Sequence, residues 1–373
     1  MQSILRVILF FGGLWLLVFT FYSIVRTFVV PRNEKVLLVR IVFKSIRFLF
    51  DLMLMPSNSF FYWDRVLALY APLCLLALSV TGIGLMWISY FAMFTGFGIP
   101  WNSALTVSGS FLLTLGAANN HSLWVNVLGF SESVFGLLMI AMLVSFLPTI
   151  YSAFSKREVM VTRLEYRAGS PPSGVEIVAR LHRLGEVGHL NQLWSTWENW
   201  FVEVEESHTS LFALAFFRSP KPQHSWVNAA GAILDAASLV SSTVDQDLNY
   251  QTEMCLQAGI ASLLSIADFF DLSKNQPAEN KNETENETEG NLSISYEQYK
   301  LACLKLSIQG VPLKQDTVRA WADFQKSRGL YDAALLGLAK WTVAPETTWS
   351  YTRPKIRHSP FLAKVGLHPT DDD

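Results

Sequence analysis

Residues 101–120 read WNSALTVSGSFLLTLGAANN, a segment with several polar residues and two glycines but no charged side chain. The segment lies inside a longer stretch, Val66 to Ser155, in which Glu132 is the only residue among Asp, Glu, Lys and Arg. Long apolar runs stand on both sides of it. Because hydrocarbon tolerates irregular backbone only where protein buries it or where it lines a water-filled path, we expect a helix, a re-entrant loop and a second helix.

The composition indicates a chain that lies partly in lipid. Of its 373 residues, 51% are hydrophobic and 16% are charged, whereas soluble domains average about 25% charged residues. Nearly all the charges fall in residues 31–65 and after residue 155, which predicts a membrane part and a soluble part. No domain is strongly basic, so nucleic acid is not an expected partner. Neither a disulfide framework nor a metal site is predicted, because the cysteines are isolated at Cys74, Cys255 and Cys303.

Three apolar runs are long enough to cross a hydrocarbon core of about 30 Å. They cover Ile4–Val29, Val66–Phe94 and Ser131–Phe154. Lys and Arg are frequent in residues 31–65 and absent from residues 66–155. Because cytoplasmic loops carry the excess of Lys and Arg, we expect a multi-pass protein of the cell membrane, with a short N-terminus outside and the C-terminal domain in the cytoplasm.

Between the first two runs, charged residues recur on one side of a predicted helix. Arg40, Lys44, Arg47 and Asp51 are spaced four, three and four apart in a segment otherwise rich in Val, Ile, Leu and Phe. This spacing predicts an amphipathic helix in the inner membrane interface rather than a fourth span. Such a helix would either anchor the chain or couple cytoplasmic movement to the next span.

After Lys156 the sequence is typical of an all-α soluble domain. Apolar residues recur every three or four positions, and runs with period two are scarce. Residues 273–294 are rich in Asn and Glu and poor in apolar residues, which predicts a disordered insertion. The tail, residues 342–373, is predicted to be loosely ordered. The predicted helices are Val175–Leu184, Leu190–Val204, Val227–Val240, Met254–Phe270, Tyr296–Ile308 and Ala333–Trp341.

The order of features in residues 66–155 carries a resemblance to a known family. An apolar outer helix comes first, then an uncharged half-helix over Asn102–Leu113, then Thr-Leu-Gly at 114–116, then an inner helix that begins near Gly129. This order resembles the two-helix pore module of the potassium-channel superfamily, which has Thr-Val-Gly at the corresponding place. The first span and the C-terminal region lie outside the resemblance.

The resemblance implies a selectivity filter, in which backbone carbonyls surround a dehydrated ion. The family's next three residues, Tyr-Gly-Asp, are replaced here by Ala-Ala-Asn at 117–119. An alanine in a left-handed backbone conformation costs roughly 1 kcal/mol, and the tyrosine that would brace the filter is lost. Potassium selectivity is therefore not carried over. The implied filter residues are Thr114, Leu115, Gly116, Ala117 and Ala118.

The resemblance also implies roles for residues around the filter, as a hinge and as an outer vestibule. In the inner helix, Gly136 and Pro148 form a candidate hinge, since proline removes a backbone hydrogen bond. Glu132 has two interpretations: an acid in the first turn of the inner helix after Ser131, or part of a carboxylate ring at the outer mouth. The implied outer vestibule consists of Asn119, Asn120, His121 and Glu132.

Together these features imply a homotetrameric, cation-permeable channel that is gated by its cytoplasmic helical domain. The expected partners are further copies of the chain and the lipid bilayer; permeant monovalent cations take the place of cofactors, and no catalytic motif is recognised. The changed filter leaves a second function open, a non-conducting, membrane-anchored scaffold or sensor that retains a channel fold. The fold class is an α-helical membrane protein with three transmembrane helices, a re-entrant pore loop and an all-α cytoplasmic domain. The predicted parts are 1–65, the first span and interfacial helix; 66–157, the pore module; 158–341, the domain; and 342–373, the tail.

Overall fold

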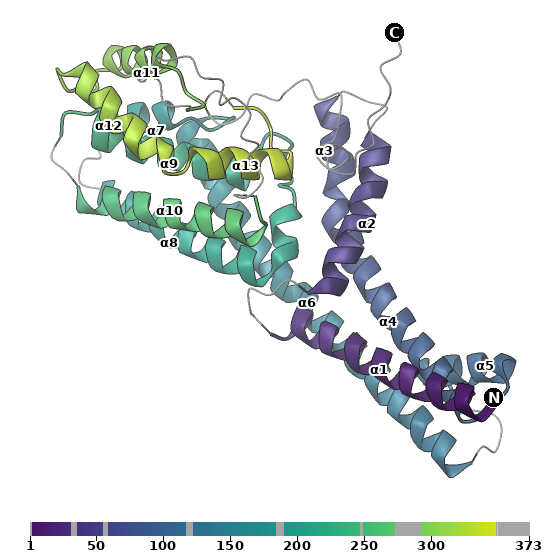
Figure 1. The fold of residues 1–373 in the computed structure, drawn as a ribbon. Coiled ribbons are helices and arrows are strands. Elements are labelled where there is room, and N and C mark those ends of the chain that lie inside the picture. The colour runs from purple at the N-terminus through teal and green to yellow at the C-terminus, as the bar shows by residue number, and fades with distance from the viewer. Residues whose placement is uncertain are drawn as a thin grey trace, which may run out of the picture. The chain divides into compact units, whose positions relative to one another are not determined.

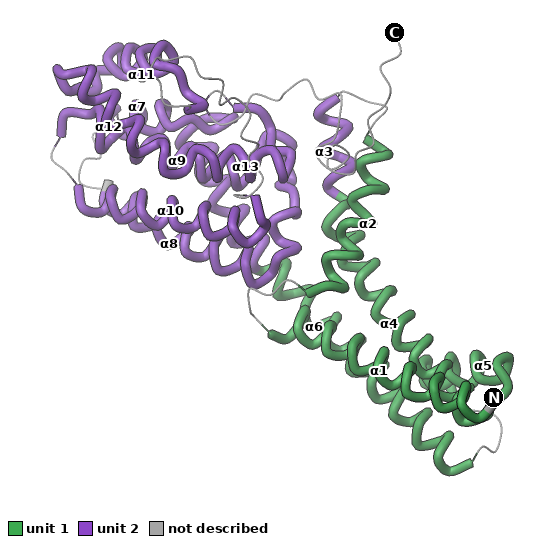
Figure 2. The backbone as a smooth tube through the Cα atoms, viewed as in Figure 1, with its two compact units in different colours: residues 1–55, 69–152 green, residues 56–68, 153–373 purple. Residues whose placement is uncertain are grey.

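A computed structural model describes residues 2–30, 36–54, 59–116, 122–183, 190–246, 249–272, 292–347 and 349. Within these residues every regular element is a helix, and the named β-pairing is an isolated bridge between Val244 and Leu313. The prediction of an α-helical fold is confirmed. Figure 1 shows the helices along the chain. The chain divides into two compact units, which Figure 2 colours separately: unit 1 comprises residues 1–55 and 69–152, and unit 2 comprises residues 56–68 and 153–373.

Three helical segments are long and apolar enough to cross a membrane. They are Ser3–Phe28, Phe60–Gly96 and Leu123–Ala168. The second and third contain the predicted spans Val66–Phe94 and Ser131–Phe154, and the first covers the predicted span Ile4–Val29 as far as Phe28. The third segment is helix α6, with 46 residues. At 1.5 Å per residue it is about 69 Å long, more than twice the thickness of a hydrocarbon core. A hydrocarbon core can therefore hold only part of α6, and charged residues of α6 begin again at Lys156 after the apolar run.

In unit 1, helix α1 (Gln2–Phe28) packs along α4 (Tyr70–Gly96) in the opposite direction. Glycines bring the two backbones close together. A Cβ atom placed on Gly13 of α1 would lie 2.5 Å from the carbonyl oxygen of Ser89, and one on Gly96 of α4 would lie 2.8 Å from that of Arg6. Small residues at such positions are the usual basis of close helix packing in membranes.

Helix α2 (Leu37–Leu54) also belongs to unit 1 and packs against the start of α4. The Tyr70 hydroxyl donates a 3.1 Å hydrogen bond to the carbonyl oxygen of Phe43. Arg47 Nε donates at 3.1 Å to Asp51, whose side chain is buried. One end of the predicted polar stripe therefore faces protein rather than solvent, and the interfacial location of this helix stays a prediction.

Unit 2 is built around helix α9 (Trp226–Ser242), which is buried along almost its whole length. A helix that is mostly apolar and buried on nearly all sides is expected at the centre of a domain. Helices α7, α10, α12 and α13 contact it, and α8 packs against α10. The bounds are α3 (Phe60–Ala68), α7 (Gly174–Arg183), α8 (Leu190–Ser210), η1 (Phe212–Phe216), α10 (Tyr250–Phe269), α11 (Tyr296–Ile308), α12 (Thr317–Gly329) and α13 (Asp332–Thr342).

Helix α12 was not predicted, because the residues on its buried side do not form an apolar pattern in the sequence. Its buried residues are Ala320, Phe324 and Arg328, four apart. Arg328 is fully buried and is neutralised by Asp235 of α9 and by Asp332, which lies 2.8 Å away. A buried arginine breaks the hydrophobic period although it occupies a core position.

The predicted limits of two irregular regions need correction. Ile294, at the end of the predicted disordered insertion 273–294, is buried in the core, and the neighbouring Ser293 donates a backbone hydrogen bond to Asp332 at 2.9 Å. Residues 273–291 lie outside the described residues. At the start of the predicted tail, the carbonyl oxygen of Pro345 accepts a 2.8 Å hydrogen bond from buried Asn228.

Candidate functional site

Helix α5 (Trp101–Leu112) turns back along α4 instead of running away from it (Figure 1). Gly98, with a φ of +96°, lies in the turn between the two helices. The Ser108 hydroxyl then reaches the carbonyl oxygen of Trp87 at 3.4 Å. Trp87 lies about 14 Å before the end of α4 at 1.5 Å per residue. The half-helix predicted over Asn102–Leu113 is therefore present, and it returns along the preceding helix.

One side of α5 is buried in unit 1 and the other is exposed. The buried residues Ala104, Val107, Ser108 and Phe111 follow helical spacing. Their apolar members belong to a core cluster with Met86, Tyr90, Met93 and Phe94 of α4 and Val125 of α6. Gly129 of α6 faces the Phe111 ring so closely that an added Cβ atom would lie 2.4 Å from it. The half-helix is thus packed between α4 and α6.

Polar contacts fasten α5 to its neighbours. The Ser108 hydroxyl donates a 2.6 Å hydrogen bond to Glu132 Oε1, and the Ser133 hydroxyl donates a 2.5 Å hydrogen bond to the carbonyl oxygen of Phe111. Glu132 is 0% exposed. Because polar groups are costly in apolar surroundings unless they are paired, these contacts favour one position of the half-helix.

The location of Glu132 differs from both sequence interpretations. Helix α6 begins at Leu123, so Glu132 lies in the third turn rather than the first. Its carboxyl group is buried against α5, within the same chain, instead of being exposed at a mouth. The physical reason is that Glu132 has a nearby hydroxyl partner, Ser108, on the face of α5 that packs inward.

The backbone after α5 adopts a left-handed cap. Thr114 has a φ of +57°; its N–H bonds the Phe111 carbonyl at 3.0 Å, while the N–H of Leu115 bonds the Ser110 carbonyl at 2.8 Å. This pair of hydrogen bonds is a Schellman motif, which normally places glycine where Thr114 stands. A non-glycine residue in this conformation costs about 1–2 kcal/mol. The strain lies at the residue that the resemblance places at the start of the filter.

The described part of the implied filter is exposed in the single chain. Leu115 is 77% exposed, and Gly116 has a φ of +76° with open space around its Cα atom. Thr114 is exposed as well. The other sequence-predicted residues of the filter and vestibule, Ala117, Ala118, Asn119, Asn120 and His121, lie outside the described residues.

The two candidate hinge residues have different surroundings. A Cβ atom on Gly136 would lie 3.1 Å from the Leu112 side chain, so this glycine gives α5 room to approach α6. Pro148 is exposed, and α6 is helical on both sides of it. The neighbouring Thr149 hydroxyl donates to the Ser145 carbonyl at 3.3 Å. Bending at either residue stays a prediction.

The C-terminal part of α6 is anchored within unit 2 by Arg157. This side chain is 2% exposed and donates to the carbonyl oxygens of Leu214 at 2.9 Å and Phe217 at 2.7 Å. It also pairs with Glu158 at 2.8 Å and contacts His208 Nε2 at 3.3 Å. The sequence did not predict these partners of Arg157, because an arginine just after an apolar run is typical of a membrane boundary.

Helix α3, which precedes α4, is anchored within unit 2 in a similar way. Asp64 of α3 pairs with Arg218. Arg218 also donates to the carbonyl oxygens of Thr342 at 2.9 Å and Val343 at 3.0 Å. The helix before α4 is therefore held in unit 2 by Asp64, and the C-terminal part of α6 is held in unit 2 by Arg157.

Comparison of the chain with protein-family models, with curated proteins and with solved structures finds no match. Among the described residues, no group of three or more His, Cys, Asp or Glu side chains is arranged to hold a metal ion. The geometry of α4, α5 and α6 is therefore the main basis for a functional conclusion.

Proposed function

We propose that this protein is a homotetrameric, cation-permeable channel of the cell membrane, gated by its cytoplasmic helical domain. One observation carries the proposal: α5 returns along α4 and is held there by α6 through the Ser108–Glu132 and Ser133–Phe111 hydrogen bonds. An uncharged half-helix between two membrane-spanning helices requires burial in protein or access to water. A re-entrant pore loop meets this requirement.

The electrostatics of α5 favour cations. The C-terminal end of a helix carries partial negative charge, equivalent to roughly half an elementary charge. Helix α5 has neither an acid in its first turn nor a base in its last, so nothing on it offsets that field. Its C-terminal end leads directly into Thr114, Leu115 and Gly116. A cation close to these residues would be stabilised by the helix end and by backbone carbonyls.

A pore of this kind needs more than one copy of the chain. Each chain contributes one half-helix, and Leu113 and Leu115 beyond its end are 67% and 77% exposed. In membrane surroundings four copies around a central axis, as the resemblance implies, would bring these segments together. Residues 114–118 would then form the narrowest ring.

Gating is proposed to follow from the anchors in unit 2. Helix α6 is continuous from Leu123 to Ala168, and Arg157 fixes its C-terminal part to the carbonyl oxygens of Leu214 and Phe217. Asp64 fixes α3, which leads into α4. A rearrangement of the domain would therefore pull on both helices that flank the half-helix.

The decisive experiment is a flux measurement on the purified protein in liposomes, with potassium, sodium and chloride gradients. We expect cation flux that Gly116→Leu abolishes. Gly12→Leu is the matched control, because Gly12 on α1 also has no atom within 4 Å of an added Cβ. Cross-linking in the same liposomes should give four copies.

Two results would contradict parts of this proposal. No flux of any ion at varied pH and voltage would favour the second function, a non-conducting membrane-anchored scaffold or sensor. Undiminished flux through the Gly116→Leu variant would place the conduction path elsewhere in the protein.

A further inference from the structure

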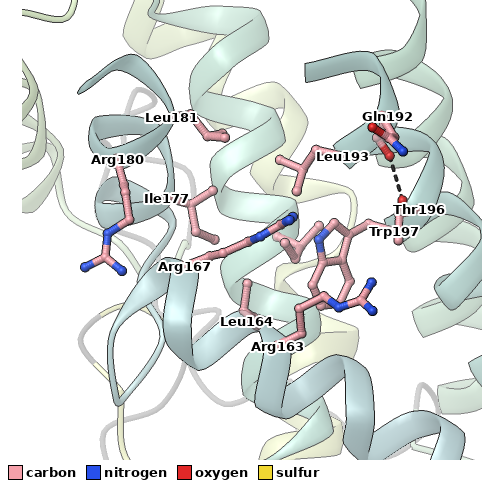
Figure 3. Close-up of a pocket in the computed structure, with 11 residues that line it drawn as sticks. Arg163, Leu164, Arg167, Ile177, Arg180, Leu181, Gln192, Leu193, Thr196 and Trp197 are labelled. Carbon is pink, nitrogen blue, oxygen red and sulfur yellow. Dashed lines mark hydrogen bonds between the residues drawn. The ribbon is translucent and has the colours of Figure 1, made fainter. Parts of the chain in front are cut away.

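A cavity of about 280 Å³ lies inside unit 2, where the end of α6 meets α7, α8 and α9 (Figure 3). Pockets that hold small molecules in proteins typically measure about 300–1,000 Å³, and this cavity is slightly smaller, so it suits only a small ligand. Its floor is apolar and consists of the buried side chains Leu164, Ile177, Leu193, Trp197 and Ile233.

Two positive charges stand at the edge of this floor. Arg163 and Arg167 are one helical turn apart on α6, and both are exposed. Figure 3 shows the Arg167 guanidinium reaching across the floor toward Trp197, with Arg163 beside the same ring. Neither guanidinium group has a hydrogen bond or ion pair with any of the described residues. Within this part of the chain, both guanidinium groups therefore keep their donors for a ligand.

The third arginine of the cavity is occupied by the protein itself. Arg180 of α7 donates to the carbonyl oxygen of Tyr166 and pairs with Glu176 at 3.4 Å. In Figure 3 its guanidinium points away from the other two. Arg180 therefore supports the fold, whereas Arg163 and Arg167 line the cavity without a side-chain partner among the described residues.

We propose that this cavity binds a small organic anion, a carboxylate or phosphate ester attached to a hydrocarbon or ring body. Guanidinium groups bind carboxylate and phosphate oxygens through paired N–H donors. The apolar floor favours a body without polar atoms. An inorganic anion would have no apolar part to pack toward the floor, and a neutral apolar molecule would leave both guanidinium groups without an acceptor.

Binding at this cavity has a consequence for gating, which rests on the proposed function. Both arginines belong to α6, and the floor includes residues of α7, α8 and α9. An anion held by Arg163 and Arg167 with its body against Trp197 would join α6 to α8. A ligand shifts a conformational equilibrium when it makes such contacts in only one state. The ligand would therefore favour one position of α6 and so change the open fraction of the channel.

Calorimetry on the full-length protein in a non-ionic detergent tests the binding. The probes are hexyl phosphate, inorganic phosphate and hexanol. We expect hexyl phosphate to bind at least about tenfold more tightly than either of the others, and Arg163→Gln with Arg167→Gln to weaken it by about tenfold or more. Arg319→Gln with Lys326→Gln removes the same charge from an exposed face of α12 and should leave the affinity unchanged.

Equal affinities for hexyl phosphate and inorganic phosphate would overturn the proposal, and so would unchanged binding by the Arg163/Arg167 variant.

Ion flux measured in liposomes then identifies the source of the ligand. A response to hexyl phosphate in neutral liposomes indicates a soluble ligand, and a response only to phosphatidic acid in the bilayer indicates a lipid headgroup. Binding without any effect on flux overturns the regulatory role. Binding in a protein that conducts no ion overturns the proposed channel function and leaves the binding site standing.

Discussion

The hydroxyl group of Ser108 donates a 2.6 Å hydrogen bond to Glu132 Oε1, and both side chains are 0% exposed. The contact joins helix α5 to helix α6 in the apolar part of unit 1. In such surroundings an unpaired carboxyl group is costly, so the pair specifies how α5 sits against α6. This pair and the other buried contacts each predict how a substitution changes the stability of the full-length protein in detergent.

Replacing Ser108 by alanine should destabilise the protein by about 1–3 kcal/mol, because Glu132 loses its hydrogen-bond donor while it stays buried. The midpoint of thermal unfolding should fall accordingly. Ser103→Ala is the matched control, since Ser103 lies on the same helix and is exposed. Equal midpoints for the two variants would show that the Ser108–Glu132 contact contributes nothing to stability.

Two adjacent glycines of α1 should respond in opposite ways to alanine. Gly13→Ala places a Cβ atom 2.5 Å from the Ser89 carbonyl oxygen, and overpacking of this kind costs about 1–3 kcal/mol. Gly12 has no atom within 4 Å of its added Cβ, and alanine should stabilise the helix there by about 0.5–1 kcal/mol. Thermal unfolding of both variants measures the difference. A loss of stability in Gly12→Ala as large as in Gly13→Ala would refute the close packing of α1 on α4.

Arg157→Met should cost about 3–5 kcal/mol, since it leaves the buried Glu158 and two backbone carbonyls without their cationic donor. Lys156→Met, at the exposed neighbouring position, should cost far less. Denaturant unfolding followed by tryptophan fluorescence reports on unit 2, where Trp194, Trp197 and Trp200 are buried. Similar losses in the two variants would mean that Arg157 does not hold α6 in the domain.

His208 should make the stability of the protein depend on pH. Burial, and then the nearby positive charge of Arg157, lower the pKa of His208 well below its usual 6.5. The neutral ring fits its site: Nδ1 lies 2.8 Å from the Val204 carbonyl oxygen, to which it donates, and Nε2 accepts from Arg157 at 3.3 Å. As the pH falls below about 6.5 the unfolded chain binds a proton that the folded chain does not, so stability falls by up to about 1.4 kcal/mol per pH unit.

The test compares unfolding free energies between about pH 6.5 and pH 5.5. His208→Gln removes the titrating ring, and its stability should change less over this range than that of the unaltered protein. His182→Gln, at an exposed position, should keep the original slope. If His208→Gln retains the full slope, other groups account for the pH dependence.

Much of the helical layout could be predicted because most helices are indicated by the hydrophobic pattern of their own residues. Helix α5 was expected over Asn102–Leu113 and found over Trp101–Leu112, since an uncharged polar segment between two long apolar runs stands out in the sequence. The role of Glu132 could not be predicted in this way. Its neighbours in sequence suggested a helix start, whereas α6 begins at Leu123 and turns Glu132 toward Ser108, 24 residues away along the chain.

The sequence by itself determined most of the helical segments, although not α12, as well as which of them are apolar enough for a membrane and where the uncharged polar segment interrupts them. These properties follow from side-chain hydropathy and from the helical period, and neighbours along the chain are enough to define them. Only the tertiary structure decided that Arg157 meets the carbonyls of Leu214 and Phe217 and that Arg328 belongs in a core. Successive residues on a helix differ by about 100° in direction, so the partner of a polar side chain depends on how each helix is rotated against elements distant in sequence.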